Sequence, residues 1–202
     1  TIITLKNSFH GRTITTLTAT GQDVFHNYFF PFDEGFRYAR AGSMDSVQEV
    51  AGHDVCAVML ELVQGEGGVL PMEPDFVHFQ QYGILPDAVS FAKGIAGGLP
   101  MGGFLASDRT RAVLGPGTHA TTFGGNPICA AAAQVVLDTL DEDALAAVRA
   151  KGEYLRARIE ALGSPYLGAT RGLGLMIGVE VKGGATNREL AGRLIQNGLL
   201  VL

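Results

Sequence analysis

Short apolar runs alternate with amphipathic stretches along this chain, and the alternation predicts an α/β fold. Residues 1–5 are β-branched and apolar and predict a strand. Residues 55–63 and 88–92 are apolar runs typical of strands buried in a parallel sheet, whereas residues 25–40 have no clear period and predict irregular surface structure. Because ligands of open α/β sheets collect at strand ends, the loops after the two apolar runs are the expected place for a site.

Helices are predicted where apolar residues follow capping residues at helical spacing. Residues 43–51 are a short candidate with Ser43 as its cap. Residues 127–140 form an Ala-rich stretch that opens with proline at its favoured first-turn position. Residues 143–162 carry an apolar stripe and end at Gly163, a plausible stop.

The last third of the chain predicts a separate, smaller α/β layer. Residues 173–181 and 199–202 predict strands, and residues 187–197 predict a helix with a cap-like start. We therefore expect a large domain over residues 1–139, with a mainly parallel sheet between two layers of helices. A small C-terminal domain follows over residues 140–202, and both domains are expected to be incomplete.

Composition restricts the class of protein. Hydrophobic residues make up 47% of the chain and charged residues 17%, as in a globular enzyme. A net charge of −5 without a basic run argues against nucleic acid, and no apolar stretch is long enough to span a membrane. Cys56 and Cys129 are expected to be buried thiols in a reducing cytoplasm, and no histidine spacing indicates a metal site.

Lys93 stands between the apolar run 88–92 and a glycine-rich loop, KGIAGGLPMGG. A lysine at a buried strand end is costly unless it is paired, neutral or used covalently. A desolvated amine is also an activated nucleophile. The alternative is a lysine that extends into solvent, and spacing alone leaves both interpretations open.

Residues 117–127, GTHATTFGGNP, place hydroxyls and small residues directly before a predicted helix. Backbone N–H groups and the helix dipole favour an anion there, and a threonine hydroxyl can add a hydrogen bond. The segment therefore indicates a phosphate site, with helix capping by Thr or Asn as the alternative.

Four further polar residues stand on loops rich in small residues. Glu66 is flanked by glycines after an apolar run, and Arg12 and Arg171 lie in glycine-containing loops that suit recognition of carboxylates. A surface salt bridge is the alternative for each arginine. His10 could stack or relay protons, or could be a structural histidine.

Five segments, in this order, resemble the class III aminotransferases of pyridoxal-phosphate (PLP) fold type I, and within that family the N-acetylornithine branch. They are NSFHGRT (7–13), ELVQGEGGV (61–69), SFAKGIAGGLPMGG (90–103), TTFGGNP (121–127) and RGLGLMIG (171–178). The similarity runs essentially from end to end. A single segment of this kind would be weak support, whereas five in order are specific.

The resemblance implies a role for each matched residue. Lys93 would hold the cofactor covalently and later move a proton at the substrate carbon, and Phe9 would stack on the pyridine ring. Arg12 would bind a substrate carboxylate, and Arg171 the α-carboxylate of 2-oxoglutarate. Glu66 would pair with Arg171 while the amine donor is bound and move away when the dicarboxylate arrives.

The same resemblance extends the cofactor site and implies a homodimer. Thr122 would hydrogen-bond the cofactor phosphate, and in this family that threonine comes from the neighbouring subunit. Thr121 and His10 are grouped with the cofactor-binding residues.

Two features of the family have no counterpart in the chain. One is a buried strand whose Asp pairs with the pyridine nitrogen, between the QGEGG loop and the lysine; the other is a phosphate loop that precedes the FHGR segment. The helix pattern that starts at residues 74–77 also has no room to finish. We therefore predict that a stretch is missing near residues 76–79, and that sequence precedes the strand-like start.

The function implied is transfer of the terminal amino group of N2-acetyl-L-ornithine to 2-oxoglutarate, within arginine biosynthesis. Ornithine, succinylornithine or 4-aminobutyrate is the alternative amine donor. A non-catalytic aminotransferase-like ligand sensor is an alternative of a different class. Such a sensor would need a basic helix-turn-helix segment, and the sequence has none.

Overall fold

A computed structural model describes residues 1–73, 76 and 85–201 of the 202-residue chain. The chain divides into two compact units: Thr1–Val77 together with Val148–Leu202, and His78–Ala147. The predicted missing stretch near residues 76–79 lies, apart from Phe76, outside the described residues.

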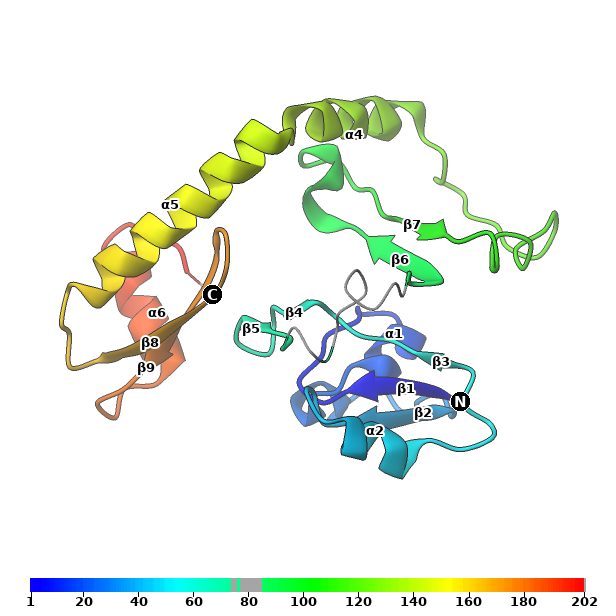
Figure 1. The fold of residues 1–202 in the computed structure, drawn as a ribbon, viewed down its shortest axis with the longest axis horizontal. Helices are drawn as coiled ribbons and strands as arrows, with labels where there is room; N and C mark the ends of the chain where they lie inside the picture. Colours follow the sequence, from blue (N-terminus) through cyan, green and yellow to red (C-terminus); the bar gives the residue numbers. More distant parts are fainter. Residues whose placement is uncertain (74–75, 77–84, 202) are drawn as a thin grey trace. The chain divides into compact units, whose positions relative to one another are not determined.

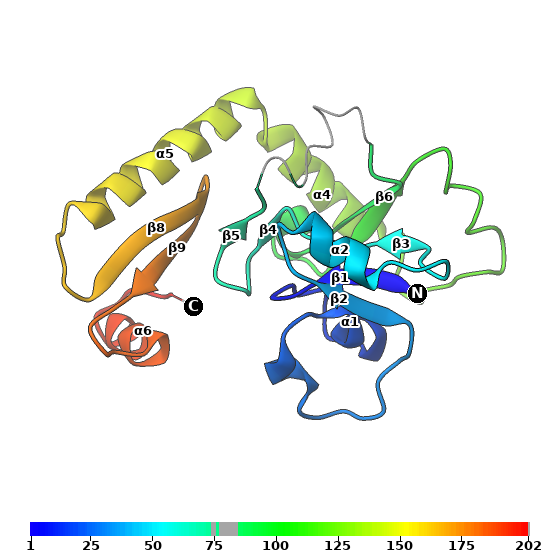
Figure 2. The ribbon, with the colours of Figure 1, turned by 60° about the horizontal axis from the view of Figure 1, so that its bottom comes forward.

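The first unit is built on a parallel sheet. Its strands β1 (Ile2–Leu5), β2 (Phe36–Ala39) and β3 (Ala57–Val58) follow the order β2-β1-β3, and both pairings are parallel. Helices α1 (Ile14–Ala19) and α2 (Met44–Val50) lie on opposite sides of this sheet (Figures 1 and 2). The predicted α/β class with a parallel sheet is confirmed.

The core of this unit forms around β1, as its apolar sequence predicts. The fully buried residues Ile3, Leu5 and Ala39 cluster with Met72. Helix α2 begins as expected, because the Ser43 side chain accepts a hydrogen bond from the backbone N–H of Ser46 at 3.2 Å.

Two expectations for this unit are wrong. Residues 55–63 do not form one buried strand: β3 covers two residues, β4 (Val63–Gln64) follows separately, and Val58 and Leu62 are 51% and 55% exposed. Among the described strands β3 pairs with β1 alone, so it is an edge strand rather than a central one. Strand β2 lies in the segment expected to be irregular, because in-register pairing with β1 overrides a weak local pattern.

The C-terminal part of the first unit is an antiparallel hairpin with two helices. Strands β8 (Leu167–Leu173) and β9 (Met176–Val181) form the hairpin, so the single strand expected at 173–181 is the second of two. Gly174, with φ of +52°, provides the tight turn between them.

Helix α5 (Glu142–Glu160) precedes the hairpin and α6 (Asn187–Gln196) follows it, both within one to two residues of the predicted bounds. Helix α6 starts with a reciprocal capping box between Thr186 and Glu189. Residues 199–201, expected to begin a strand, form none.

The second unit contains strands β6 (Ala88–Phe91) and β7 (Gly103–Ala106), which pair antiparallel. Between them lies the short 3-10 helix η2 (Lys93–Ala96), and after them the helix α4 (Pro127–Thr139), close to its predicted bounds. No helix in the described part of the chain is long and apolar enough to cross a membrane.

The first unit also contains the short 3-10 helix η1 (Asp23–His26), and a second antiparallel pair joins β4 to β5 (Leu70–Pro71).

Candidate functional site

Lys93 lies two residues beyond the end of strand β6 and has a left-handed backbone, with φ of +57°. This conformation costs a non-glycine residue on the order of 1 kcal/mol, and such outliers cluster at functional sites. Packing maintains it, because Ala96 of the same 3-10 turn is 1% exposed and η2 packs against α4. The Lys93 side chain itself is exposed.

The loop that carries Thr121 and Thr122 leads into α4. The Asn126 side chain accepts hydrogen bonds from the backbone N–H groups of Ile128 and Cys129 at 2.9 and 3.3 Å, so it caps the helix. The capping alternative is therefore realised at this helix start. In residues 1–73, 76 and 85–201, the hydrogen bonds around this loop involve Thr118 and Asn126 and neither the Thr121 nor the Thr122 hydroxyl.

The segment that carries Phe9 and His10 is fixed by its backbone. The N–H of Phe9 donates to the Glu61 carboxylate at 2.8 Å, and the N–H of His10 donates to the Thr20 hydroxyl at 3.0 Å. The buried Nε2 atom of His10 has no partner among the described residues, and burial lowers the pKa of His10. Glu61 was not identified from the sequence; its place in the apolar run before the QGEGG loop was the available signal.

Arg12 lies over two aromatic rings that contact each other. Its guanidinium carbon is 5.3 Å from the ring centroid of Phe9 and 4.6 Å from that of Phe25, and the two rings meet edge to face at 5.6 Å. An open cavity of about 370 Å³ adjoins this cluster. Phe25 was not identified as a site residue from the sequence, because residues 25–40 have no clear period.

Arg171 of β8 lies against the loop between β4 and β5. Its Nε donates to the backbone carbonyl of Gly68 at 2.7 Å, two residues after Glu66. Close packing supports the contact, since a Cβ on Gly178 would stand 2.8 Å from the same carbonyl oxygen. Glu66 is exposed, and no ion pair joins it to Arg171 in the described residues.

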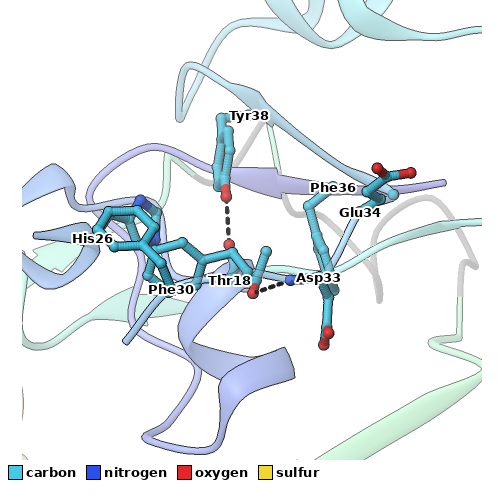
Figure 3. A pocket seen from close by; sticks show the side chains of 9 residues that line it. Thr18, His26, Phe30, Asp33, Glu34, Phe36 and Tyr38 are labelled. Atoms are coloured by element: carbon cyan, nitrogen blue, oxygen red, sulfur yellow. Dashed lines mark hydrogen bonds between the residues drawn. The ribbon is translucent and has the colours of Figure 1, made fainter. Parts of the chain in front are cut away.

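A second cavity, of about 400 Å³, contains none of the predicted residues (Figure 3). The Tyr38 hydroxyl donates to the carbonyl of Thr18, and the Thr18 hydroxyl accepts from the Asp33 N–H at 3.2 Å. His26 Nε2 lies 3.0 Å from the Leu17 carbonyl. The polar groups that line this second cavity are thus largely paired with one another. No cluster of three or more potential metal ligands occurs in residues 1–73, 76 and 85–201.

Comparison with known proteins defines the family. The profile of the class-III aminotransferases matches residues 1–80 and 78–202, so the chain belongs to that family. It is 39% identical to the acetylornithine aminotransferase of Haemophilus ducreyi, over 100% of this chain and 59% of the relative. It is 37% identical to the enzyme of that name from Caldanaerobacter subterraneus, over 99% of this chain and 59% of the relative.

Solved structures agree with this assignment. The ornithine aminotransferase of Toxoplasma gondii ME49 superposes with a TM-score of 0.85 at 28% identity, over 98% of this chain and 56% of that one. A second T. gondii ornithine aminotransferase structure, with PLP at partial occupancy in its active site, has a TM-score of 0.86 at 26% identity, over 100% of this chain and 56% of that one. The predicted fold class and the cofactor of the family, pyridoxal 5'-phosphate, are confirmed.

The chain spans about three fifths of the length of these curated relatives, 59% for the H. ducreyi enzyme. The two family matches meet at residues 78–80, and the alignment to that enzyme runs over 233 positions against 202 residues here. Both observations support a stretch missing near residues 76–79, which stays a prediction.

Each of the two units, taken by itself, contains side chains that suit binding of PLP. In the second unit, Lys93 provides an amine on a constrained backbone, and Thr121 and Thr122 provide hydroxyls that make no hydrogen bond with the described residues. In the first unit, the buried Nε2 of His10 has no partner in the described part of the chain and is a polar atom that a bound group could satisfy. The partner of the pyridine nitrogen has no counterpart in the chain.

Proposed function

We propose that this protein transfers the terminal amino group of N2-acetyl-L-ornithine to 2-oxoglutarate, giving N-acetyl-L-glutamate 5-semialdehyde and L-glutamate, as a step of arginine biosynthesis. The names of the relatives at 39% and 37% identity support the choice of donor. Bound PLP supplies an electron sink for the substrate carbon.

The main structural support for the proposal is the contact between Arg171 and the loop that contains Glu66. It joins two motifs, QGEGG and RGLG, that are far apart in the sequence and that the family resemblance assigns to the dicarboxylate substrate. The planar guanidinium of Arg171 suits bidentate binding of a carboxylate. Its Nε is held by Gly68, so the remaining N–H groups are presented from a fixed position.

The other matched residues complete the proposed roles. Lys93 holds the cofactor and moves the proton at the substrate carbon. Phe9 stacks on the cofactor ring beside His10, on a backbone fixed by Glu61. Arg12 binds the carboxylate of the amine donor.

The proposed assembly is a cytoplasmic homodimer in which Thr122 reaches the phosphate of the partner's cofactor. The apolar side chains Phe123, before α4, and Ile128 and Val135, on α4, are 84%, 69% and 65% exposed, as expected of a surface that a partner covers. We also retain, as a proposal, the division into a large domain over residues 1–139 and a small domain over residues 140–202.

Ornithine is the second candidate donor, because the T. gondii structures with TM-scores of 0.85 and 0.86 are ornithine aminotransferases. A half-reaction screen separates the candidates. PLP-loaded protein is mixed with N2-acetylornithine, N2-succinylornithine, ornithine or 4-aminobutyrate, and the visible spectrum of the cofactor is followed. We expect the fastest loss of the aldehyde-form absorbance with N2-acetylornithine.

Adding 2-oxoglutarate should restore the spectrum and release glutamate. Faster reaction with ornithine would support the second candidate. PLP binding without a spectral change for any donor would favour a non-catalytic ligand-binding protein.

A further inference from the structure

The cavity of about 400 Å³ in Figure 3 is lined mainly by aromatic rings. Five of the nine residues of its wall carry a ring: His26, Phe30, Phe32, Phe36 and Tyr38. Four of the rings contact one another in a row, because the centroid of Phe32 lies 5.1 Å from that of Phe30 and 5.2 Å from that of His26. The His26 ring in turn lies 6.1 Å from the Tyr38 ring. The wall therefore contains several π faces, whose negative potential attracts a cation.

The side-chain donors of this wall are engaged within the protein. The Tyr38 hydroxyl donates to the Thr18 carbonyl (Figure 3), and the Thr18 hydroxyl donates to the Ile14 carbonyl at 2.8 Å. The Nε2 atom of His26 lies 3.0 Å from the Leu17 carbonyl, which can only accept, so Nε2 carries the hydrogen. The other nitrogen of the neutral ring, Nδ1, is then an acceptor. Toward a ligand, these side chains offer acceptors rather than donors.

The charge of the wall is negative. Asp33 and Glu34 contribute carboxylates, and no lysine or arginine is found among the described residues that line the cavity. Asp33 accepts a hydrogen bond from the Thr15 hydroxyl, but neither carboxylate forms an ion pair within residues 1–73, 76 and 85–201. Arg37, the nearest arginine in the sequence, pairs with Asp54 at 2.9 Å instead. This wall therefore favours a cation over an anion.

We propose that this cavity binds a small organic cation that bears a guanidinium group. A planar guanidinium can stack on an aromatic face while the N–H groups at its edge donate to carboxylates. A quaternary ammonium ion would use the ring faces alone, since it has no N–H for the acceptors of Asp33, Glu34 and His26. The volume of about 400 Å³ lies in the range of small-molecule sites. None of the residues assigned to the cofactor or to the substrates lines the cavity, so the inference does not depend on the proposed function.

The test compares ligands of similar size and different charge. Calorimetry measures the dissociation constant of n-butylguanidinium with PLP-loaded protein, and backbone amide chemical shifts of residues 32–38 locate the site. N-Butylurea is the neutral planar counterpart, and pentanoate is the matched anion. The cation should bind about two- to thirtyfold more tightly than the urea, the range from an exposed to a desolvated cation–π contact, and pentanoate should bind most weakly.

Three outcomes of this comparison would overturn the proposal. They are equal affinities of n-butylguanidinium and N-butylurea, tighter binding of pentanoate, and shift changes confined to residues outside the cavity. Tetramethylammonium tests the need for N–H donors and should bind more weakly than n-butylguanidinium. If it binds more tightly, the assignment to a guanidinium is wrong.

A pair of charge variants tests the carboxylate. Glu34→Gln removes an exposed carboxylate from the wall and should weaken n-butylguanidinium by up to about fivefold, the scale of an exposed ion pair, with little change for N-butylurea. Glu49→Gln is the matched control, because it removes the same charge from an exposed position on α2, outside the cavity. Equal weakening by the two variants would contradict a local role of Glu34.

A pair of ring variants tests the aromatic wall. Phe30 and Phe29 are neighbours and are 70% and 68% exposed, but only Phe30 lines this cavity. Phe30→Leu should weaken n-butylguanidinium by about two- to fivefold, as expected of an exposed cation–π contact, whereas Phe29→Leu should leave its affinity unchanged. Weaker binding in both variants, or in neither, would show that the ring of Phe30 does not contact the cation.

Discussion

Arg171 and Gly68 are 103 positions apart in the chain and are joined by a hydrogen bond of 2.7 Å from the Arg171 Nε to the Gly68 carbonyl. The bond attaches the β8–β9 hairpin to the loop that carries Glu66. The fold thus places the predicted carboxylate-binding arginine beside the loop of its predicted acidic partner, without an ion pair between the two side chains in the described residues.

Gly68→Ala should disturb this contact. A Cβ on Gly68 would stand 3.1 Å from a terminal nitrogen of Arg171, and the φ of +110° is strained for alanine. We expect a loss of about 1 kcal/mol in the free energy of unfolding and a raised KM for 2-oxoglutarate. Gly35→Ala is the matched control, with φ of +91° and nothing within 4 Å. Gly35→Ala should lose a similar free energy of unfolding and keep the KM for 2-oxoglutarate. If Gly35→Ala raises this KM as well, the change in KM results from backbone strain and not from the contact with Arg171.

Glu66→Gln tests the switch between substrates. The neutral side chain can no longer compensate Arg171 while the amine donor is bound, so the donor half reaction should slow by up to about fivefold, the scale of an exposed ion pair. The half reaction with 2-oxoglutarate should change less. Stopped-flow spectra of the two half reactions measure this, with Glu73→Gln as the control on a nearby exposed acid. Equal slowing of both half reactions would argue against a switch.

His10 should make stability fall in mild acid. Burial lowers the pKa of His10 below its ordinary value of 6.5 in the folded protein. Above that pH the imidazole is neutral in the folded and unfolded states; below it, the unfolded chain binds a proton that the folded protein does not, so the free energy of unfolding falls. The free energy of unfolding, measured with urea above and below pH 6.5, should fall less in His10→Gln than in the unchanged protein.

Asn126→Ala should weaken the start of α4. The substitution removes the acceptor of two backbone N–H groups, at a cost of about 1 kcal/mol in the free energy of unfolding. Asn126→Asp, which keeps an acceptor at the helix N-terminus, should retain most of that stability. Thermal unfolding measures the stability of both variants. If Asn126→Ala and Asn126→Asp lose the same stability, the hydrogen bonds of the cap do not stabilise the helix.

Local signals account for what the sequence predicted well. Ser43 and Pro127 mark the starts of α2 and α4, and Gly163, with φ of +57°, lies just beyond the end of α5. Each works through hydrogen bonds or backbone freedom within a few residues, so a short window contains the information.

Contacts between distant segments could not be predicted in the same way. The bond between Arg171 and Gly68 and the stacking of Arg12 on Phe25 depend on how loops meet in three dimensions. The apolar run 55–63 was overpredicted as a buried strand for a related reason: burial depends on which elements cover a strand, and Val58 lies at an edge. The family resemblance identified Arg171 and Glu66, but their local packing is a finding of the structure.

The identity of the lysine that holds the cofactor is the most direct test of the account. Protein loaded with PLP is reduced with borohydride, digested and mapped by mass spectrometry. We predict the cofactor mass on Lys93, its loss in Lys93→Ala and its retention in the control Lys151→Ala, with transamination by Lys93→Ala reduced on the order of a thousandfold or more. A reduced adduct on Lys6 or Lys151, or near-normal turnover by Lys93→Ala, would contradict it.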